Sequence, residues 1–322
     1  MIPRISVIVP NFNHGEFLEK RIQTILRQSR TDFELILLDD HSSDQSLDIL
    51  ARYAQDPHCR LLVNERNSGN PFKQWNKGVE VAKGDFIWIA ESDDYASEFI
   101  LEKLASRLEQ HPQAGLAYCQ SWVVDEKEQQ LGLNDAWTRA LDPGRWQKDF
   151  YADGREECRN FLVFQNTIPN ASAVLFRKDI YERIGRADET FFYAGDWHVW
   201  VRMLAVSDIC FCSEPLNFYR THAATVRKKA LAGTRRVAEN YRILDWLLIH
   251  MNIPADSAEK ALDLAMDRWQ RALTARAGNL SPARNRDIFH VARRIDNRLY
   301  RRFSRHFLAG LKRKLKRPAQ LA

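Results

Sequence analysis

Short apolar runs and helical patterns alternate through the first hundred residues. Four short runs, at residues 5–9, 33–38, 60–63 and 86–90, are predicted to be strands, and the first two are typical of buried strands. Between them, apolar positions recur at helical spacing near residues 17–26, 44–50 and 70–83. Because strands and helices alternate, the pattern predicts an α/β fold in which helices flank a mainly parallel, Rossmann-like sheet.

The pattern changes twice further along the chain. From residue 99 to about 230, helices are mixed with short strands such as residues 173–176 and 209–212. After about residue 234 the pattern is helical to the end. We therefore predict an α/β domain over residues 1–230 and a helical C-terminal extension over residues 231–322, with a boundary that rests on composition alone.

Polar residues cluster where three of the four predicted strands end. Residues 10–13 follow the first strand, residues 39–40 the second, and residues 91–94 the fourth. In open parallel sheets, ligands bind outside the carboxyl ends of the strands. These clusters are therefore the candidate site.

The chemistry of these clusters suits a divalent cation. Neither GxGxxG nor GxxxxGK[ST] follows the first strand, which argues against a dinucleotide oxidoreductase and against a P-loop kinase or NTPase. Glu91, Asp93 and Asp94 crowd within four residues, and such crowding is costly unless a cation such as Mg²⁺ or Mn²⁺ relieves it. The alternative is an acidic N-terminus for the helix that begins near Glu98.

Five motifs follow one another along residues 4–95. They are Pro10-Asn11-Phe12-Asn13, the segment Asp39-Asp40-His41-Ser42-Ser43-Asp44, Asn76-Lys77-Gly78, Gly84-Asp85 and Glu91-Ser92-Asp93-Asp94. In this order and spacing they resemble the family 2 glycosyltransferases with the GT-A fold. A weaker match continues through residues 195–197 to about Thr225. The resemblance implies a nucleotide-binding half over residues 1–98 and an acceptor half over residues 99–230.

The resemblance implies a nucleotide site at the first two motifs. It places Phe12 against the nucleobase and makes Asp39 the acceptor of a hydrogen bond from the base. N3–H of uracil or thymine suits a carboxylate acceptor, which favours a UDP- or dTDP-sugar, while guanine stays open. As alternatives, Phe12 is ordinary core and Asp39 is a helix cap. The remaining residues assigned to the nucleotide are Pro10, Asn13, Asp40 and Ser92.

The DxD motif of the family corresponds to residues 91–93. The resemblance therefore implies that Asp93 is a direct ligand of Mn²⁺ or Mg²⁺. Glu91 replaces the first aspartate of the common motif and is a second candidate ligand. His222 is a third, because some relatives use a histidine near this position; otherwise it is an ordinary core or surface histidine. The ammonium group of Lys73 is placed where it would contact a phosphate or the ribose of the nucleotide. The alternative is an exposed lysine that contacts only solvent.

The segment Gly195-Asp196-Trp197 resembles the acceptor-side segment of the family. The resemblance implies that Asp196 is the general base of an inverting reaction, which deprotonates the acceptor hydroxyl as that oxygen attacks the anomeric carbon. Gly195 stands where many relatives have glutamate. Asp196 is also a candidate N-cap for the following helix, and the two roles are compatible. Trp197 and Asn170 are assigned to the acceptor side.

Positive charge is concentrated in the C-terminal tail, residues 284–317. Residues 284–317 hold 13 Lys or Arg against two Asp, a charge of +11, which leaves −5 for the rest of a chain with a net charge of +6. Apolar residues at helical spacing over residues 288–303 make this segment a basic amphipathic helix, which suits an anionic membrane surface. The alternative is a helix packed on the protein with a solvated basic face. No motif supports nucleic-acid binding.

The predicted cellular location rests on the absence of membrane-span and signal-peptide patterns. No apolar run approaches the roughly 20 residues of a membrane span, and no stretch follows the signal-peptide pattern. The five cysteines show neither CxxC nor zinc-site spacing and are predicted to be buried thiols. We therefore predict a cytoplasmic protein that also lies peripherally on the inner face of the cell membrane if its tail contacts lipid.

Together these features predict an inverting enzyme that moves a sugar from a nucleotide diphosphate to an acceptor hydroxyl. The expected acceptor is a glycan or a lipid-linked intermediate in surface polysaccharide, lipopolysaccharide or glycoconjugate assembly. One alternative is a sugar-1-phosphate nucleotidyltransferase, which would need a Gly-rich loop that residues 10–13 do not supply. Another is a non-catalytic nucleotide- or carbohydrate-binding protein with the same fold, against which Asp93 and Asp196 argue.

Overall fold

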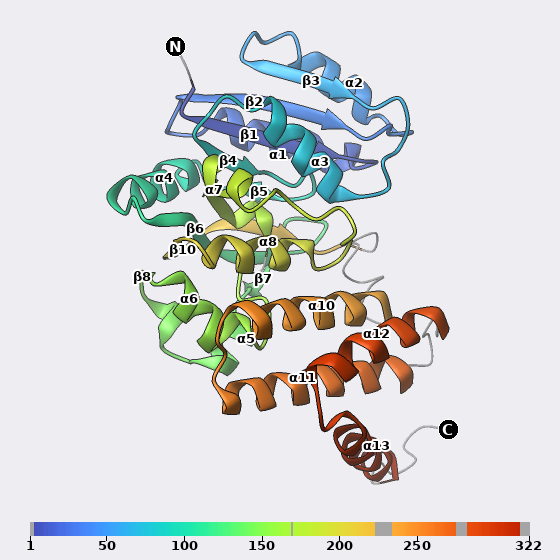
Figure 1. Cartoon of the computed structure of the whole chain (residues 1–322). Coiled ribbons are helices and arrows are strands. Elements are labelled where there is room, and N and C mark those ends of the chain that lie inside the picture. The colour runs from blue at the N-terminus through green and yellow to red at the C-terminus, as the bar shows by residue number, and fades with distance from the viewer. Residues whose placement is uncertain (1–2, 169, 223–233, 275–281, 316–322) are drawn as a thin grey trace. The chain divides into compact units, whose positions relative to one another are not determined.

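The computed structural model describes residues 3–168, 170–222, 234–274 and 282–315 (Figure 1). The chain divides into two compact units, the first made of Met1–Cys158 and Asn166–Ala223, and the second of Arg159–Gln165 and Ala224–Ala322. The predicted boundary near residue 230 lies outside the described residues. Residues 159–165, which the sequence places in the α/β domain, group with the second unit.

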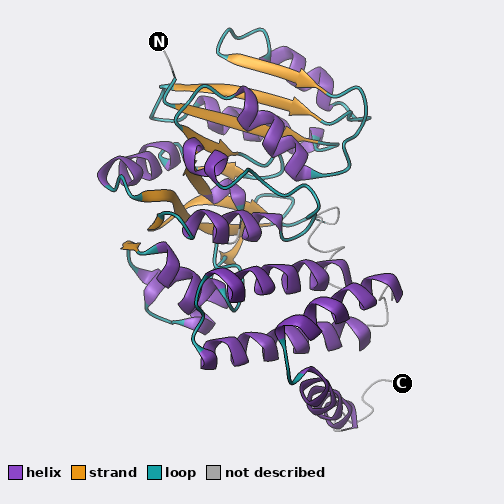
Figure 2. Ribbon diagram, in the orientation of Figure 1, coloured by secondary structure: helices purple, strands orange, loops and turns teal. Residues whose placement is uncertain are grey.

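The first unit is built on one mixed sheet with helices packed against it (Figure 2). The strand order is β3-β2-β1-β4-β9-β6-β10-β5, with β7 paired to β6 and β8 paired to β10. The strands are β1 (Ile5–Asn11), β2 (Phe33–Asp39), β3 (Cys59–Val63), β4 (Phe86–Ile89), β5 (Tyr95–Ala96), β6 (Ala114–Val124), β7 (Gln130–Leu133), β8 (Phe150–Ala152), β9 (Val174–Arg177) and β10 (Asp208–Arg220).

The helices of this unit follow the predicted alternation. They are α1 (Gly15–Leu26), α2 (Ser46–Tyr53), α3 (Pro71–Val81), α4 (Ile100–Gln110), α5 (Ala136–Leu141), α6 (Gly154–Glu157), α7 (Lys178–Arg183) and α8 (Gly195–Leu204), with short 3-10 helices at Arg145–Gln147 and Ala171–Ala173. A π-helical turn, Cys158–Leu162, follows α6, and from Arg159 onward it belongs to the second unit.

The predicted α/β fold is confirmed, and the sheet is parallel from β3 to β4 and mixed beyond β4. Strands β3, β2, β1 and β4 are parallel neighbours, as the βα alternation predicts. Strand β9 is antiparallel to both β4 and β6, and β10 runs parallel to β6. The parallel register places the ends of β1 and β2 side by side, with Asn11 opposite Asp39.

Two glycines of the sequence motifs are required by close packing. Helix α3 lies on β1 at Gly78, where a Cβ would fall 2.5 Å from Cγ2 of Ile8. At Gly84, before β4, a Cβ would fall 2.6 Å from the carbonyl carbon of Ile5. Any side chain at either position would collide with β1, so these glycines keep the parallel strands and α3 together.

The second unit contains α10 (Thr234–His250), α11 (Ala255–Thr274), α12 (Pro282–Ile295) and α13 (Leu299–Leu315). Helix α10 packs on α11 and α12, and α11 packs on α13. The tail is thus two helices rather than the one predicted. Ile288, Ala292 and Leu299 of the predicted apolar stripe are buried in this unit, which supports the packed-helix alternative for that stripe. None of the described helices is long and apolar enough to cross a membrane.

Candidate active site

The ends of β1 and β2 are joined by a buried carboxylate. Nδ2 of Asn11 donates to Oδ1 of Asp39 at 3.0 Å, and the backbone N–H of Ser42 donates to Oδ2 at 2.8 Å. Asp39 is buried, and its two oxygens accept hydrogen bonds from the end of β1 and from the loop after β2. Its contact with a nucleobase stays a prediction, to be made through the second lone pair that each oxygen keeps.

Phe12 projects from a turn that is held by polar contacts. Asn13 adopts the left-handed conformation, with φ of 55°, and its Oδ1 accepts the N–H of Ser43 at 2.7 Å. Oγ of Ser42 accepts the N–H of Asn13 at 3.0 Å. The ring of Phe12 is left 44% exposed, so the alternative of an ordinary core residue is wrong. Pro10, by contrast, is buried within β1.

Asp40 organises the loop that leads into α3. Its carboxylate accepts hydrogen bonds from Nδ2 of Asn64, from the N–H and hydroxyl of Ser68, and from Nε2 of Gln74. The predicted nucleotide residue Asp40 is therefore buried and fully engaged with the protein. Lys73 lies in the first turn of α3 with its side chain exposed.

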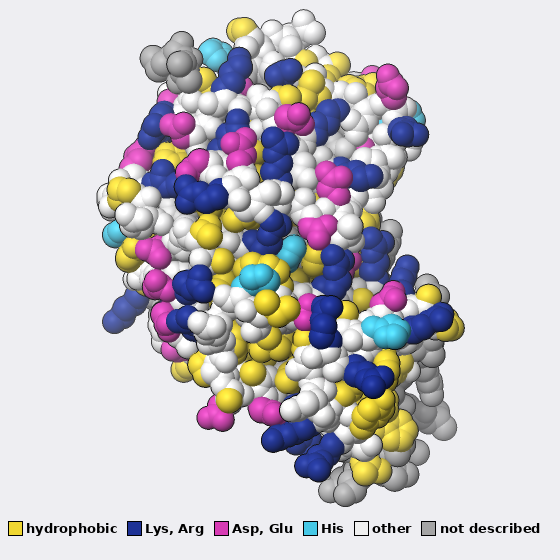
Figure 3. All heavy atoms as spheres, viewed as in Figure 1, with side chains coloured by type: hydrophobic (Ala, Val, Ile, Leu, Met, Phe, Trp, Pro, Cys, Tyr) yellow, Lys and Arg dark blue, Asp and Glu magenta, His cyan; other side chains and the backbone are white. Residues whose placement is uncertain are grey.

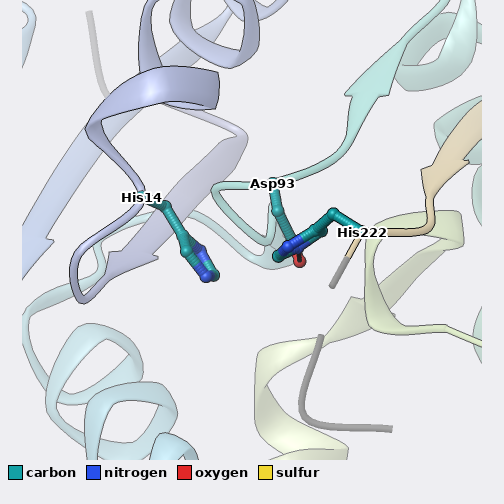
Figure 4. A group of neighbouring side chains, drawn as sticks. All are labelled: His14, Asp93 and His222. Carbon is teal, nitrogen blue, oxygen red and sulfur yellow. Dashed lines mark hydrogen bonds and ion pairs between the residues drawn. The ribbon is translucent and has the colours of Figure 1, made fainter. Parts of the chain in front are cut away.

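Three side chains that can bind a metal converge at the carboxyl end of the sheet (Figure 4). They are His14, Asp93 and His222, and one ligand atom from each lies within 4.8 Å of the others. Nε2 of His222 is 3.1 Å from Oδ2 of Asp93. Burial acts to raise the pKa of Asp93, but the hydrogen bond with His222 and the charge of nearby His14 hold it below its usual value.

This cluster contains two of the three predicted metal ligands, together with one residue that sequence reasoning missed. His14 directly follows the first motif in the loop after β1, at the edge where ligands were expected, and that position was the available signal. Glu91 is not part of the cluster. Its Oε1 accepts the indole N–H of Trp75 at 3.0 Å. Burial, followed by the charge of Asp93, raises the pKa of Glu91 to about 8.

The carboxylate of Asp94 connects its own loop to two other segments of the chain through hydrogen bonds. Its Oδ1 accepts the backbone N–H of Arg220, and its Oδ2 accepts Nδ2 of Asn170 at 2.8 Å. Nε of Arg220 also donates to the carbonyl of Asp93 at 2.9 Å. Burial, with the charge of Asp93, raises the pKa of Asp94 to about 6. Asn170, predicted on the acceptor side, is thus buried against the metal-side loop.

A fully buried arginine adds positive charge beneath these carboxylates. Arg21 lies on the apolar face of α1 between Leu18 and Ile25, which is the signal that sequence reasoning could have used. Its guanidinium stacks 4.8 Å from the ring centroid of Trp88, and its nitrogens have no hydrogen-bond partner among the described residues. Burial lowers the pKa of Arg21 to about 10, while Asp94 and Asp93 act in the opposite direction.

Asp196 lies in the first turn of α8 and is half-buried. Nδ2 of Asn166 donates to its Oδ2 at 3.0 Å. The N-cap position belongs to Ala194, so Asp196 does not serve as the predicted cap. Trp197, assigned to the acceptor side, is buried.

Helix α3 is fastened to the segment that precedes Asp196. Nδ2 of Asn70, the N-cap of α3, donates to the carbonyls of Glu189 and Phe191, each at 2.7 Å. Asn76 donates to the carbonyl of Ala187 and to the side chain of Glu189. These bonds explain the asparagine of the Asn76-Lys77-Gly78 motif. They join the helix that carries Lys73 to the region of the predicted base.

The profile of the family described as Glycosyl transferase family 2 matches residues 6–185. This match covers more than half of the chain, which therefore belongs to glycosyltransferase family 2 and is a glycosyltransferase. Glycosyltransferase GlyG of Streptococcus pneumoniae serotype 4 is 26% identical over 268 residues, 77% of this chain and 82% of GlyG. The poly(ribitol-phosphate) beta-N-acetylglucosaminyltransferase TarS of Staphylococcus aureus is 32% identical over 208 residues, 59% of this chain and 35% of TarS.

Solved structures agree on the GT-A fold. TarS 1–349 of S. aureus, in complex with UDP-GlcNAc, has a TM-score of 0.67 at 15% identity and covers 94% of this chain and 89% of its own. The mannosyltransferase PcManGT of Pyrobaculum calidifontis, in complex with GDP-Man and Mn²⁺, has a TM-score of 0.62 at 16% identity, covering 99% of this chain and 88% of its own.

Proposed function

We propose that this glycosyltransferase transfers a sugar from a UDP- or dTDP-sugar to an acceptor hydroxyl, with inversion at the anomeric carbon and with a divalent cation. The observation that carries the proposal is the approach of Asp93 and His222 to 3.1 Å at the carboxyl edge of the sheet. These residues are 129 positions apart in the sequence. A carboxylate and an imidazole are both ligands that first-row divalent cations accept.

The proposed binding of the nucleotide-sugar donor rests on the exposed ring of Phe12 and the buried carboxylate of Asp39. Phe12 is held outward by the contacts of Asn13, so its face is available to stack on a base. Asp39 lies at the neighbouring strand end and accepts a base N–H. TarS, a relative, has been solved with UDP-GlcNAc and with UDP, which supports a uridine donor here.

The residues present fit a cation that neutralises a diphosphate. Asp93 and His222 would hold it, and when bound it would supply charge stabilisation to the departing nucleoside diphosphate. Lys73 is exposed at the first turn of α3, where it adds a positive charge for phosphate or ribose. Mn²⁺ is favoured over Mg²⁺ because imidazole is a softer ligand than carboxylate or water.

Asp196 is the proposed general base. Nδ2 of Asn166 donates to Oδ2, which helps to orient the carboxylate that would accept the hydroxyl proton. Attack then occurs from the face opposite the leaving nucleotide. We further propose that the acceptor belongs to surface polysaccharide, lipopolysaccharide or glycoconjugate assembly; the relative TarS is named for the transfer of N-acetylglucosamine to poly(ribitol-phosphate).

The exposed residues of α13 support our proposal that this helix contacts an anionic membrane. Such a contact would place the protein on the inner face of the cell membrane. Tyr300, Phe307 and Leu308 are 65%, 48% and 57% exposed. Arg301 is exposed beside them, as is Arg305, which also pairs with Asp263. Figure 3 shows basic and hydrophobic side chains next to one another where α13 reaches the surface. Exposed apolar rings flanked by cations suit the headgroup region of an anionic bilayer.

Calorimetry with UDP, with and without MnCl₂, tests the donor and metal roles. We expect Mn²⁺ to tighten UDP binding, and we expect Asp93→Ala to weaken the Mn²⁺-assisted binding by about tenfold or more. Asp179→Ala is the matched control, because Asp179 is an exposed aspartate on α7. UDP affinity that is indifferent to Mn²⁺, or equal in the Asp93 variant and the wild type, would contradict the proposal. NMR of the transferred sugar then tests inversion.

A further inference from the structure

His14 lies beside Asp93 and His222, although the three come from separate parts of the chain. His14 belongs to the loop between β1 and α1, Asp93 follows β4, and His222 follows β10. Figure 4 shows the three side chains directed into the same space. The 3.1 Å between Nε2 of His222 and Oδ2 of Asp93 is close to the roughly 3 Å between adjacent ligands of an octahedral ion with bonds of about 2.1 Å.

The imidazole of His14 is fixed by a hydrogen bond and by aromatic packing. Its Nδ1 is 2.8 Å from Oγ of Ser92, and Ser92 is buried. The ring of Phe17 lies 6.2 Å from the ring of His14 and 4.9 Å from that of His222, between centroids. A histidine that binds a metal through one nitrogen typically donates its other N–H to a neighbour, which sets the tautomer and the ring orientation.

We propose that His14 is a third protein ligand of the cation, through Nε2, and that Ser92 is its positioning residue. Nδ1–H then donates to Oγ of Ser92, and the lone pair of Nε2 faces the ion. The inference rests on the proposed function, because this is the cation that would meet the donor's diphosphate. The role of Ser92 is thereby indirect: its buried hydroxyl serves His14 rather than the nucleotide.

This ligand set has consequences for metal choice and for donor binding. Two imidazoles and one carboxylate favour Mn²⁺ and other first-row transition metals over Mg²⁺. Three protein ligands leave coordination positions for phosphate oxygens and water. His14 is two residues from Phe12, so a bound ion also holds the loop that carries the exposed ring.

Pulsed electron paramagnetic resonance of bound Mn²⁺ counts the coordinated imidazoles directly. The probes are Mn²⁺ alone and Mn²⁺ with UDP, added to the full chain. We expect nitrogen couplings from two imidazoles in the wild type and from one in His14→Ala. We also expect the preference for Mn²⁺ over Mg²⁺, measured by competition without turnover, to fall about tenfold in His14→Ala.

Two further variants sharpen the assignment. His58→Ala removes an exposed histidine of the same unit and should leave both the couplings and the metal preference unchanged. Ser92→Ala should keep two coupled imidazoles but weaken Mn²⁺ binding about tenfold, because the ring loses its orienting bond. Circular dichroism checks that each variant is folded.

The outcomes separate this inference from the proposed function. A wild-type spectrum with one imidazole, or a His14→Ala spectrum identical to the wild type, would overturn the role of His14 while leaving a metal on Asp93 and His222. Failure of the wild type to bind Mn²⁺, with or without UDP, would overturn the metal dependence itself and the inference with it.

Discussion

The ring of Phe72 lies directly against Gly195. A Cβ on Gly195 would fall 2.4 Å from Cε2 of that ring, and Phe72 is buried. Phe72 belongs to α3, and Gly195 is the first residue of α8, next to Asp196. The contact explains in physical terms why this chain has glycine where a glutamate was the expected family residue: with Phe72 in place, no side chain fits.

We therefore expect Gly195→Ala to displace the first turn of α8 or the Phe72 ring. The steric conflict should lower the free energy of unfolding by about 1–3 kcal/mol and reduce turnover by moving Asp196. Adding Phe72→Leu to Gly195→Ala should restore part of both losses. Gly144→Ala is the matched control, because a Cβ there meets nothing closer than 3.7 Å. Thermal melting and initial rates measure the effects, and an unperturbed Gly195→Ala protein would contradict the packing argument.

A buried carboxylate outside the site predicts a pH-dependent stability. Glu157 is buried with Arg145 as its partner, and burial raises its pKa to about 7 although Arg145 opposes this. Because the folded pKa is above the unfolded value of about 4.3, the folded state binds the proton more tightly. Stability from this group is therefore greatest at low pH and is lost as the pH rises through the interval from about 4.3 to 7.

Glu157→Gln should remove this loss of stability at higher pH. Between pH 5 and pH 8, the unfolding free energy of the variant relative to the wild type should rise by on the order of 2 kcal/mol. The ion pair with Arg145 forms as Glu157 ionises, so its pH dependence is already contained in the folded pKa. Urea denaturation at the two pH values measures the difference. Parallel behaviour of the two proteins would show that Glu157 does not titrate in this interval.

The first half of the sheet was predictable because its parallel strands are short, mainly apolar runs between helical patterns. Strands β1 to β4 appear where residues 5–9, 33–38, 60–63 and 86–90 predict them. The eleven-residue strand β6 was missed although it lies inside the sheet. Its sequence mixes Gly115, Gln120 and Ser121 with apolar residues, so neither a continuous run nor strict alternation marks it.

The candidate site was predictable where a residue lies in a local motif. Asp93 and His222 were named from motif positions, and the structure places them together. His14 and Arg21 were missed because their significance depends on strand order and helix packing, which bring them near Asp93 from another part of the chain. Asp40 and Asn170 were assigned to ligands, whereas their described contacts are with the protein.

Contact with membranes should depend on the exposed residues of α13 rather than on the whole tail. Because α12 is partly buried in the second unit, deleting residues 284–322 would damage that unit. We expect Tyr300→Ser, Phe307→Ser and Leu308→Ser together to weaken binding to anionic vesicles about tenfold or more. Ile249→Ser, at a residue of α10 that is 62% exposed, is the matched control.

Vesicle sedimentation at low and high salt measures this binding. Added salt should release the wild type, because the arginines beside the rings contribute through screened charge. Equal sedimentation of the triple variant and the wild type, or no sedimentation of either, would contradict a membrane contact through α13.

The central claim is that Asp196 removes the acceptor proton, and Asp196→Asn tests it most directly. The amide keeps the size of the side chain and does not disturb a cap, since Ala194 is the N-cap of α8. The account predicts a folded protein with near wild-type affinity for UDP and Mn²⁺ whose kcat falls by roughly 10²-fold or more. Asp188→Asn, in the segment before α8, should transfer sugar normally. A folded, donor-binding Asp196→Asn protein that transfers sugar at the wild-type rate would contradict the account and place the base elsewhere.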